Sequence, residues 1–215
     1  MKAEAVMTLA DLEAAAAIVY RAMRPTPQQR WPLLDERAGT AVWVKHENQT
    51  PVGAFKVRGG LVYFDRLRAS GERVNGVVAA TRGNHGQSIG FAAARAGIPA
   101  AIIVPHGNSE GKNAAMRALG VELIVEGRDF QASLEAAERI ARSRGWHMVP
   151  SFHEWLVAGV ASYSLELFRG VPALDTLYVP VATVLAPVVP PSPTRSSWST
   201  PAPPLSLMKR LNLSE

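Results

Sequence analysis

The sequence contains no cysteine. A disulfide framework, a thiolate zinc site and a cysteine nucleophile are therefore excluded. It also lacks any run of about 18 apolar residues free of charge, so no membrane span is expected. The first residues, Met1 to Leu9, do not have the basic and then apolar layout of a signal peptide. These absences favour a cytoplasmic protein.

Charge is sparse as well. Only 19% of the 215 residues are charged, and 23 Lys and Arg against 18 Asp and Glu give a net charge of +5. No cluster of basic residues resembles a nucleic-acid-binding patch, so no nucleic-acid partner is expected. The 47% of hydrophobic residues are enough to bury a core, and the length allows one ordinary domain or two small ones.

Glycine disappears towards the C-terminal end. Residues 182–215 contain none, while they hold many of the chain's 16 prolines together with serine and threonine. Proline removes backbone donors and is excluded from helix interiors and central strands. We therefore expect an extended and mostly disordered Pro/Ser-rich tail, in which only Leu205 to Leu213 could form a short helix.

Upstream of Val181, short apolar runs alternate with helix-like segments. The predicted strands are Val42–Lys45, Val77–Ala80, Ala100–Val104, Val121–Val125, Trp146–Val149 and Leu177–Val181. The predicted helices cover residues 9–23, 84–96, 109–119, 129–143 and 157–168. This alternation predicts an α/β fold with a parallel sheet covered by helices on both faces. Ligands bind such sheets at the carboxyl ends of the strands.

Lys56 is the first candidate for chemistry. It lies in Gly53-Ala54-Phe55-Lys56-Val57-Arg58-Gly59-Gly60, beside glycines and an aromatic ring. Burial lowers the pKa of an ammonium group, and the neutral amine can form a Schiff base with an aldehyde cofactor. The alternative is a surface lysine at the head of a helix, which the spacing alone favours.

The second candidate is the segment Thr81-Arg82-Gly83-Asn84-His85-Gly86 at a predicted strand–helix junction. Its glycines allow the backbone to approach a ligand, and a helix N-terminus offers unpaired N–H groups to an anion. The alternative is an ordinary tight turn in which Asn84 caps the helix. His106, His147 and His153 are treated as structural histidines, and no metal-binding spacing is present.

Together these segments resemble the fold-type II pyridoxal-phosphate enzymes, in particular the threonine dehydratase (threonine ammonia-lyase) and serine dehydratase group. The resemblance runs from about Arg24 to Val181 and is carried by residues 53–59 and 81–87, in that order. Val44-Lys45-His46-Glu47-Asn48-Gln49 and residues 104–114 look like the same group. Phe55 before the lysine and Arg58-Gly59 after it favour the dehydratase branch.

The resemblance implies a fold like that of the tryptophan synthase β chain, with parallel sheets flanked by helices. Residues 57–156 would form a small α/β domain. Residues 1–56 and 157–181 would belong to a large domain built from both ends of the chain. Full-length relatives would be homo-oligomers that act on a small amino acid.

The resemblance also implies roles for single residues. Lys56 would hold pyridoxal 5'-phosphate as a Schiff base and later move the Cα proton of the substrate. Phe55 would pack near the cofactor ring, and the Asn84 side chain would bond its phenolic oxygen. Thr81, Gly83, Asn84 and His85 would form the loop that receives the substrate carboxylate. The implied reaction is α,β-elimination, which converts L-threonine or L-serine to a 2-oxo acid and ammonia.

The sequence departs from the family at three places. Ala54 stands where many relatives have serine, and Arg82 stands where serine racemases of this fold have a serine, so racemisation is less expected than elimination. The third departure follows Val181, where relatives have a glycine-rich loop that wraps the cofactor phosphate. One missing base would convert codons for Val-Gly-Asp-Gly-Ser-Gly-Pro into codons for the observed Val-Ala-Thr-Val-Leu-Ala-Pro.

We therefore hypothesise a frameshift after Val181, with a truncated large domain and residues 182–215 translated out of frame. The strand from Leu177 would then lack a partner, and cofactor binding and turnover would be weak. Resequencing of the locus that finds no missing base would contradict the frameshift.

Other functions stay open at this point. A related hydroxy-amino acid, in a 3-hydroxyaspartate or hydroxyectoine pathway, could be the substrate, and Arg58 or Arg82 near a second carboxylate would favour it. There are two alternatives of another class. One is a non-catalytic module that binds a nucleotide or another anion at residues 83–86, and the other is an inactive pseudogene product.

Overall fold

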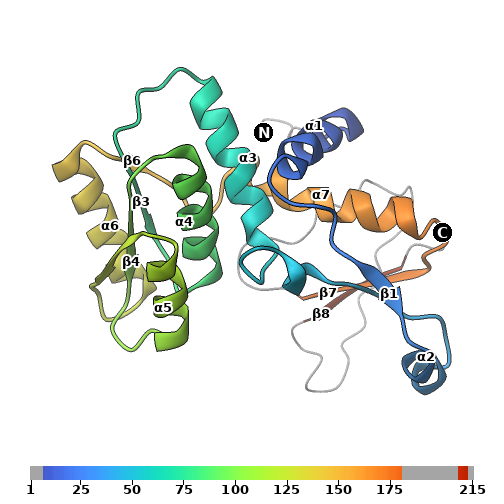
Figure 1. Ribbon diagram of the computed structural model, residues 1–215. Coiled ribbons are helices and arrows are strands. Elements are labelled where there is room, and N and C mark those ends of the chain that lie inside the picture. Colours follow the sequence, from blue (N-terminus) through green and yellow to red (C-terminus); the bar gives the residue numbers. More distant parts are fainter. Residues whose placement is uncertain (1–6, 181–207, 213–215) are drawn as a thin grey trace, which may run out of the picture.

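A four-stranded parallel sheet forms the centre of one half of the molecule. The computed structural model describes residues 7–180 and 208–212. The strand order is β5-β4-β3-β6, and all three pairings are parallel (Figure 1). The strands are β3 (Val77–Ala80), β4 (Ala100–Val104), β5 (Glu122–Val125) and β6 (His147–Met148). The predicted parallel α/β sheet is therefore confirmed, with β6 shorter than the predicted strand.

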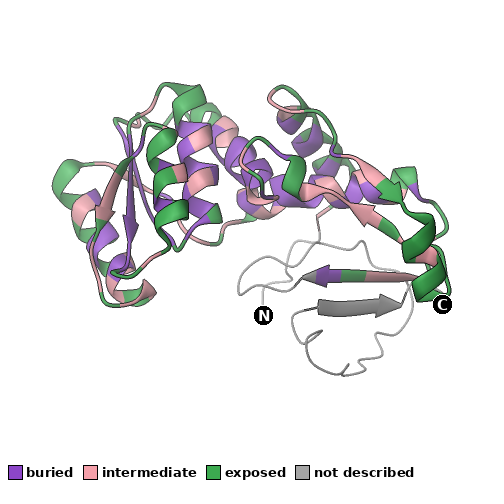
Figure 2. Cartoon of the chain, turned by 60° about the horizontal axis from the view of Figure 1, so that its bottom comes forward, coloured by how far each residue is buried: buried purple, intermediate pink, exposed green. Residues whose placement is uncertain are grey.

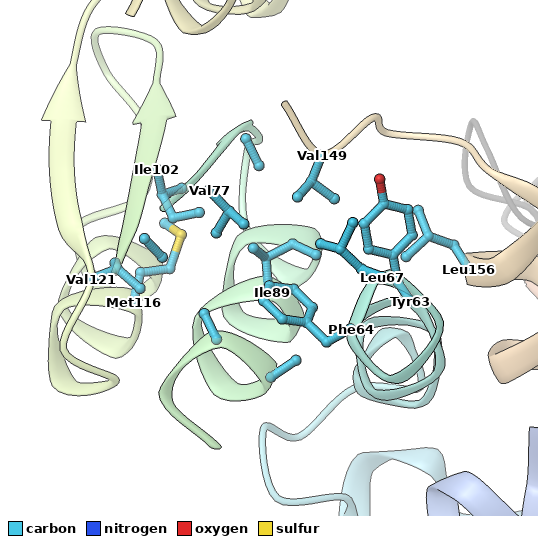
Figure 3. Close-up of a cluster of buried hydrophobic side chains, with 14 of the residues drawn as sticks. Tyr63, Phe64, Leu67, Val77, Ile89, Ile102, Met116, Val121, Val149 and Leu156 are labelled. Carbon is cyan, nitrogen blue, oxygen red and sulfur yellow. The ribbon is translucent and has the colours of Figure 1, made fainter. Parts of the chain in front are cut away.

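Helices cover both faces of this sheet. Successive side chains of β3 and β4 point to opposite faces, so each strand contributes apolar side chains to both layers of helices. Val77 and Ile102 face the cluster formed by α3 (Lys56–Ala69), α4 (Asn84–Ala96) and α5 (Glu110–Ala118) (Figure 3). Val78 and Ile103 face α6 (Phe130–Arg144). The predicted alternation of strand and helix thus produces three layers.

Helix α3 lies between this sheet and the other half of the molecule (Figure 1). On its far side, α1 (Leu9–Tyr20) and α7 (Glu154–Gly170) pack together and against α3 through Val19, Val62 and Ala158. Thr8 and Asp11 form a reciprocal capping box at the start of α1, which explains why this helix begins where the sequence predicts.

The segment between α1 and α3 forms a small antiparallel unit. Strands β1 (Gln28–Arg30) and β2 (Trp43–Lys45) pair with each other, and α2 (Pro32–Ala38) connects them. The 3-10 helix η1 (Glu47–Gln49) follows. No residue of α2 is buried, and Figure 2 shows this helix mostly exposed. Strand β1 and helix α2 were not predicted from the sequence, since neither has an apolar periodicity. A helix that begins at Lys56 was named only in the alternative interpretation of that lysine.

Strand β7 (Thr176–Pro180) corrects two expectations. It pairs antiparallel with β8 (Met208–Asn212), so the expectation that it would lack a partner is wrong. The sequence allowed a short helix within Leu205 to Leu213, but residues 208–212 form a strand instead. The open edge of β7 provides backbone donors and acceptors that an extended segment can satisfy and an isolated short helix cannot.

The rest of the predicted tail, residues 182–207 and 213–215, lies outside the described residues, and so does the position at which relatives have the phosphate-binding loop. Within the described ranges, no helix is long and apolar enough to cross a membrane.

Candidate active site

The loop after β3 is held by the side chain of Thr81. Its Oγ1 accepts hydrogen bonds from the amides of Gly83 at 3.0 Å and Gly86 at 3.3 Å. Gly83 is the N-cap of α4, so Asn84 is the first helical residue and does not cap the helix. The amides of Asn84 and His85 have no acceptor within the helix, and they are available to an anion.

His85 is buried beside this loop. Only 7% of the residue is exposed, and its Nε2 has no hydrogen-bond partner in the described part of the chain. Burial and, second, the charge of Lys56 lower the pKa of His85 to about 4. The imidazole is therefore neutral at neutral pH, and the Lys56 ammonium is close enough to influence it.

Lys56 is the first residue of α3, and its side chain is partly buried. Burial lowers the pKa of the amine, which increases the neutral, nucleophilic fraction. The preceding ring of Phe55 packs edge-on against Tyr163 of α7, with centroids 6.2 Å apart. Lys56 thus does head a helix, as the simpler interpretation has it, but it is not a fully solvated surface lysine.

Two residues that the sequence analysis gave no role complete the site. The buried hydroxyl of Ser88 on α4 donates to the backbone carbonyl of Lys56 at 2.5 Å, which joins the two predicted motifs directly. Lys112 of α5 extends across Gly83: a Cβ added there would lie 2.6 Å from its Cδ and 3.4 Å from its Nζ. The resemblance was the one signal for Lys112, and none pointed to Ser88.

Arg58, by contrast, is not available to a substrate. Its guanidinium is fully buried and binds Glu47 at 2.7 Å and Glu166 at 2.6 Å. Its remaining N–H groups donate hydrogen bonds to the hydroxyl groups of Ser162 and Thr26. Arg58 therefore cannot bind a second substrate carboxylate without breaking this network, and that part of the alternative is wrong.

Three of the other histidines, His106, His147 and His153, have different surroundings. His106 is exposed in the turn after β4. One ring nitrogen of His147 lies 2.8 Å from the Tyr63 hydroxyl and the other lies 2.9 Å from a Glu72 carboxylate oxygen. The Nδ1 of His153 accepts from the amide of Trp155 at the start of α7. These contacts give His147 and His153 structural roles.

This set of groups fits pyridoxal phosphate. An amine with a lowered pKa suits an aldehyde, and a helix N-terminus with two available amides suits an anionic group. The buried Nε2 of His85, which has no hydrogen-bond partner among the described residues, offers one further polar atom beside them.

Comparison with known proteins gives the same result. Residues 19–185 match the family model described as pyridoxal-phosphate dependent enzyme. The chain is 34% identical over 166 residues to an L-threonine dehydratase of Salmonella typhimurium, covering 77% of this chain and 32% of that protein. It is also 34% identical over 176 residues to an L-threonine ammonia-lyase of Thermotoga maritima, covering 81% of this chain and 44% of that one. The chain therefore spans less than half the length of these relatives.

Solved structures support the assignment. A pyridoxal 5'-phosphate-dependent aspartate racemase superposes with a TM-score of 0.74 at 30% identity, over 79% of this chain and 53% of that one. A T.th. threonine deaminase superposes with a TM-score of 0.69 at 29% identity, over 75% and 51%. By its sequence motifs, its fold and these similarities, the chain belongs to the family of pyridoxal-phosphate dependent enzymes.

Proposed function

We propose that this chain carries the lysine half of a site for α,β-elimination on L-threonine or L-serine, with release of a 2-oxo acid and ammonia. The observation that carries the proposal is the partly buried amine of Lys56 next to the N-terminus of α4 and the neutral imidazole of His85. The similarity to an L-threonine dehydratase and an L-threonine ammonia-lyase supports the choice of substrate class.

The position of each residue indicates its proposed role. Pyridoxal phosphate, when bound, supplies the electron sink that makes loss of the Cα proton possible. The Nζ of Lys56 would hold the cofactor and, once the substrate amine has displaced it, would accept the Cα proton. Its lowered pKa favours the neutral form that this role needs. The amides of Asn84 and His85 receive the substrate carboxylate, while Thr81 keeps the loop in shape.

Two further residues contribute to the proposed site without taking a proton. The Asn84 side chain is exposed at the first position of α4, where it would bond the phenolic oxygen of the cofactor. Phe55 would pack near the cofactor ring, and its own ring packs against Tyr163. The proposal includes the small domain over residues 57–156 and, for longer relatives, a homo-oligomer.

A substrate with a second carboxylate is the second candidate. Arg82 is exposed between Thr81 and Gly83, and the Nζ of Lys112 lies close to Gly83. Two cations beside the substrate loop would favour a dicarboxylate such as a 3-hydroxyaspartate. Activity on 3-hydroxyaspartate that exceeds activity on threonine, and that Arg82→Ala abolishes, would support this candidate over the first.

The test is a titration of the purified chain with pyridoxal phosphate, followed by the yellow absorption band of a lysine-bound cofactor. We expect a band that Lys56→Ala removes, because Lys56 is the amine of the site whose pKa burial lowers. Lys112→Ala is the matched control: it removes an ammonium from the same site and should keep the band.

The outcomes separate the candidate functions. Weak binding in this chain, and stronger binding in a version with a glycine-rich sequence from residue 182 onward, would also support the predicted loss of the phosphate loop. A band that persists in Lys56→Ala, or no band in either chain, would contradict the proposal. Nucleotide binding that Lys56→Ala leaves unchanged would favour the non-catalytic alternative.

A further inference from the structure

Ser88 lies at the contact between the two helices that carry the candidate site. It is fully buried on α4, and its hydroxyl donates to the backbone carbonyl of Lys56 at 2.5 Å. We infer that Ser88 is a positioning residue for Lys56: this hydrogen bond sets where the lysine side chain leaves α3 relative to the N-terminus of α4.

The contact is tightly packed, because Gly60 faces Ser88 one helical turn after Lys56. A Cβ at position 60 would overlap the Ser88 hydroxyl and would lie 2.7 Å from the Ser88 carbonyl oxygen. Residues four apart lie on the same face of a helix, so Lys56 and Gly60 meet α4 together. The absence of a side chain at Gly60 is what allows the Ser88 hydroxyl to reach the Lys56 carbonyl.

The same spacing links Ser88 to the substrate loop. Asn84 is four residues before Ser88 on α4, and His85 is three before it, so all three lie on neighbouring faces of one helix. A shift of α3 against α4 would therefore change the distance between the Lys56 amine and the loop. It would also change how far the amine is buried, which is the cause of its lowered pKa.

A buried serine could instead serve stability alone. Ser133 on α6 is the matched control, since it is also fully buried and donates to a backbone carbonyl, that of Glu126 at 2.7 Å. Loss of either hydroxyl should lower stability by a similar amount. Only loss of the Ser88 hydroxyl should change the chemistry of Lys56.

The experiment measures the pKa of the Lys56 amine in the full chain without cofactor. Trace acetylation with acetic anhydride at a series of neutral to alkaline pH values gives the reactivity of each lysine, read by mass spectrometry of peptides. In Ser88→Ala we expect the Lys56 pKa to rise towards its ordinary value of 10.5. The amine should then react about threefold more slowly near neutral pH, which corresponds to about half a pKa unit.

The controls make the result decisive. Lys112 in the same protein and Lys56 in Ser133→Ala should keep their wild-type profiles. An unchanged Lys56 profile in folded Ser88→Ala would overturn the inference. If Ser88→Ala does not fold, Ser88→Cys, whose thiol is a weaker donor, replaces it: a raised Lys56 pKa supports the inference and an unchanged one overturns it.

The inference rests on the proposed function only in taking Lys56 as the reactive amine. Because the labelling uses no pyridoxal phosphate, the two can fail separately. A shifted profile in Ser88→Ala together with no cofactor band in any chain would keep the positioning role and reject the function. A Lys56-dependent band together with an unchanged Lys56 profile in Ser88→Ala would support the function and reject the positioning role.

Discussion

At the scale of single residues, burial sets the protonation state of the candidate site. Lys56 and His85 are neighbouring bases, and burial is the largest cause of the lowered pKa of each. The charge on Lys56 adds to the effect on His85. Burial thus favours the neutral form of both the imidazole and the amine beside an anion-binding helix N-terminus.

The lowered pKa of His85 predicts that the folded chain loses stability in acid. Its pKa is about 4 in the folded chain against an ordinary value of 6.5, so the unfolded chain binds more protons between these two pH values. The stabilisation is fully present above pH 6.5 and decreases as the pH falls towards 4, by about 3 kcal/mol. Urea unfolding across this range should show the decrease.

His85→Gln is the reference for this measurement, because glutamine does not titrate while every carboxylate remains. The variant should lose less stability between neutral pH and about pH 4 than the wild type does. Equal losses in the two proteins would mean that His85 is not held neutral by burial.

At the scale of elements, the predictable boundaries are those with local signals. The apolar runs and Gly97 predicted β3, β4 and α4 at the residues where they occur. Helix α2 and strand β1 were not predicted, because their residues carry no apolar periodicity. Strand β8 was missed, and the sequence allowed a short helix there instead. Its pairing with β7 depends on a partner that is distant along the chain, which no local pattern reveals.

The close contact of α3 with α7 gives a prediction at this scale. A Cβ at Gly159 would overlap the carbonyl oxygen of Arg58 and lie 2.7 Å from the Cα of Gly59. Since both groups are backbone, Gly159→Ala must push the helices apart, and we expect a loss of about 2 kcal/mol or more in the free energy of unfolding.

The matched control is Gly111→Ala in α5, where nothing lies within 4 Å of the added Cβ. There the better helix propensity of alanine should stabilise the protein by up to about 1 kcal/mol. Chemical unfolding of the two variants should give opposite signs. A neutral Gly159→Ala would show that α3 and α7 are not packed this closely.

At the scale of the whole molecule, a buried network of charges joins segments far apart in the sequence. Arg58 on α3 binds Glu47 of η1 and Glu166 of α7, and Glu166 also binds Lys45 of β2 at 2.6 Å. Two cations and two carboxylates balance, so the network as a whole is neutral. It fixes the N-terminal segment and α7 on the helix that begins with Lys56.

Removal of one member should therefore cost more than an ordinary ion pair. Arg58→Met leaves Glu47 and Glu166 without their main partner, and we expect a loss of about 3–5 kcal/mol in the free energy of unfolding. Arg21→Met is the control, since its pair with Asp65 is exposed and should contribute less than about 1 kcal/mol. Similar losses from the two variants in denaturant unfolding would contradict a cooperative buried network.

The sequence by itself determined the fold class, the order along the chain of the strands and helices from β3 to β6, and both motifs, because apolar periodicity, glycine and proline act locally. It also predicted Lys56 and the loop from Thr81 to His85 as candidates. Only the tertiary structure decided that Ser88 joins them, that Lys112 crosses Gly83 and that Arg58 is committed to a buried network. The physical reason is that burial and side-chain partners depend on contacts between residues distant in the chain, and these also set the pKa of Lys56 and of His85.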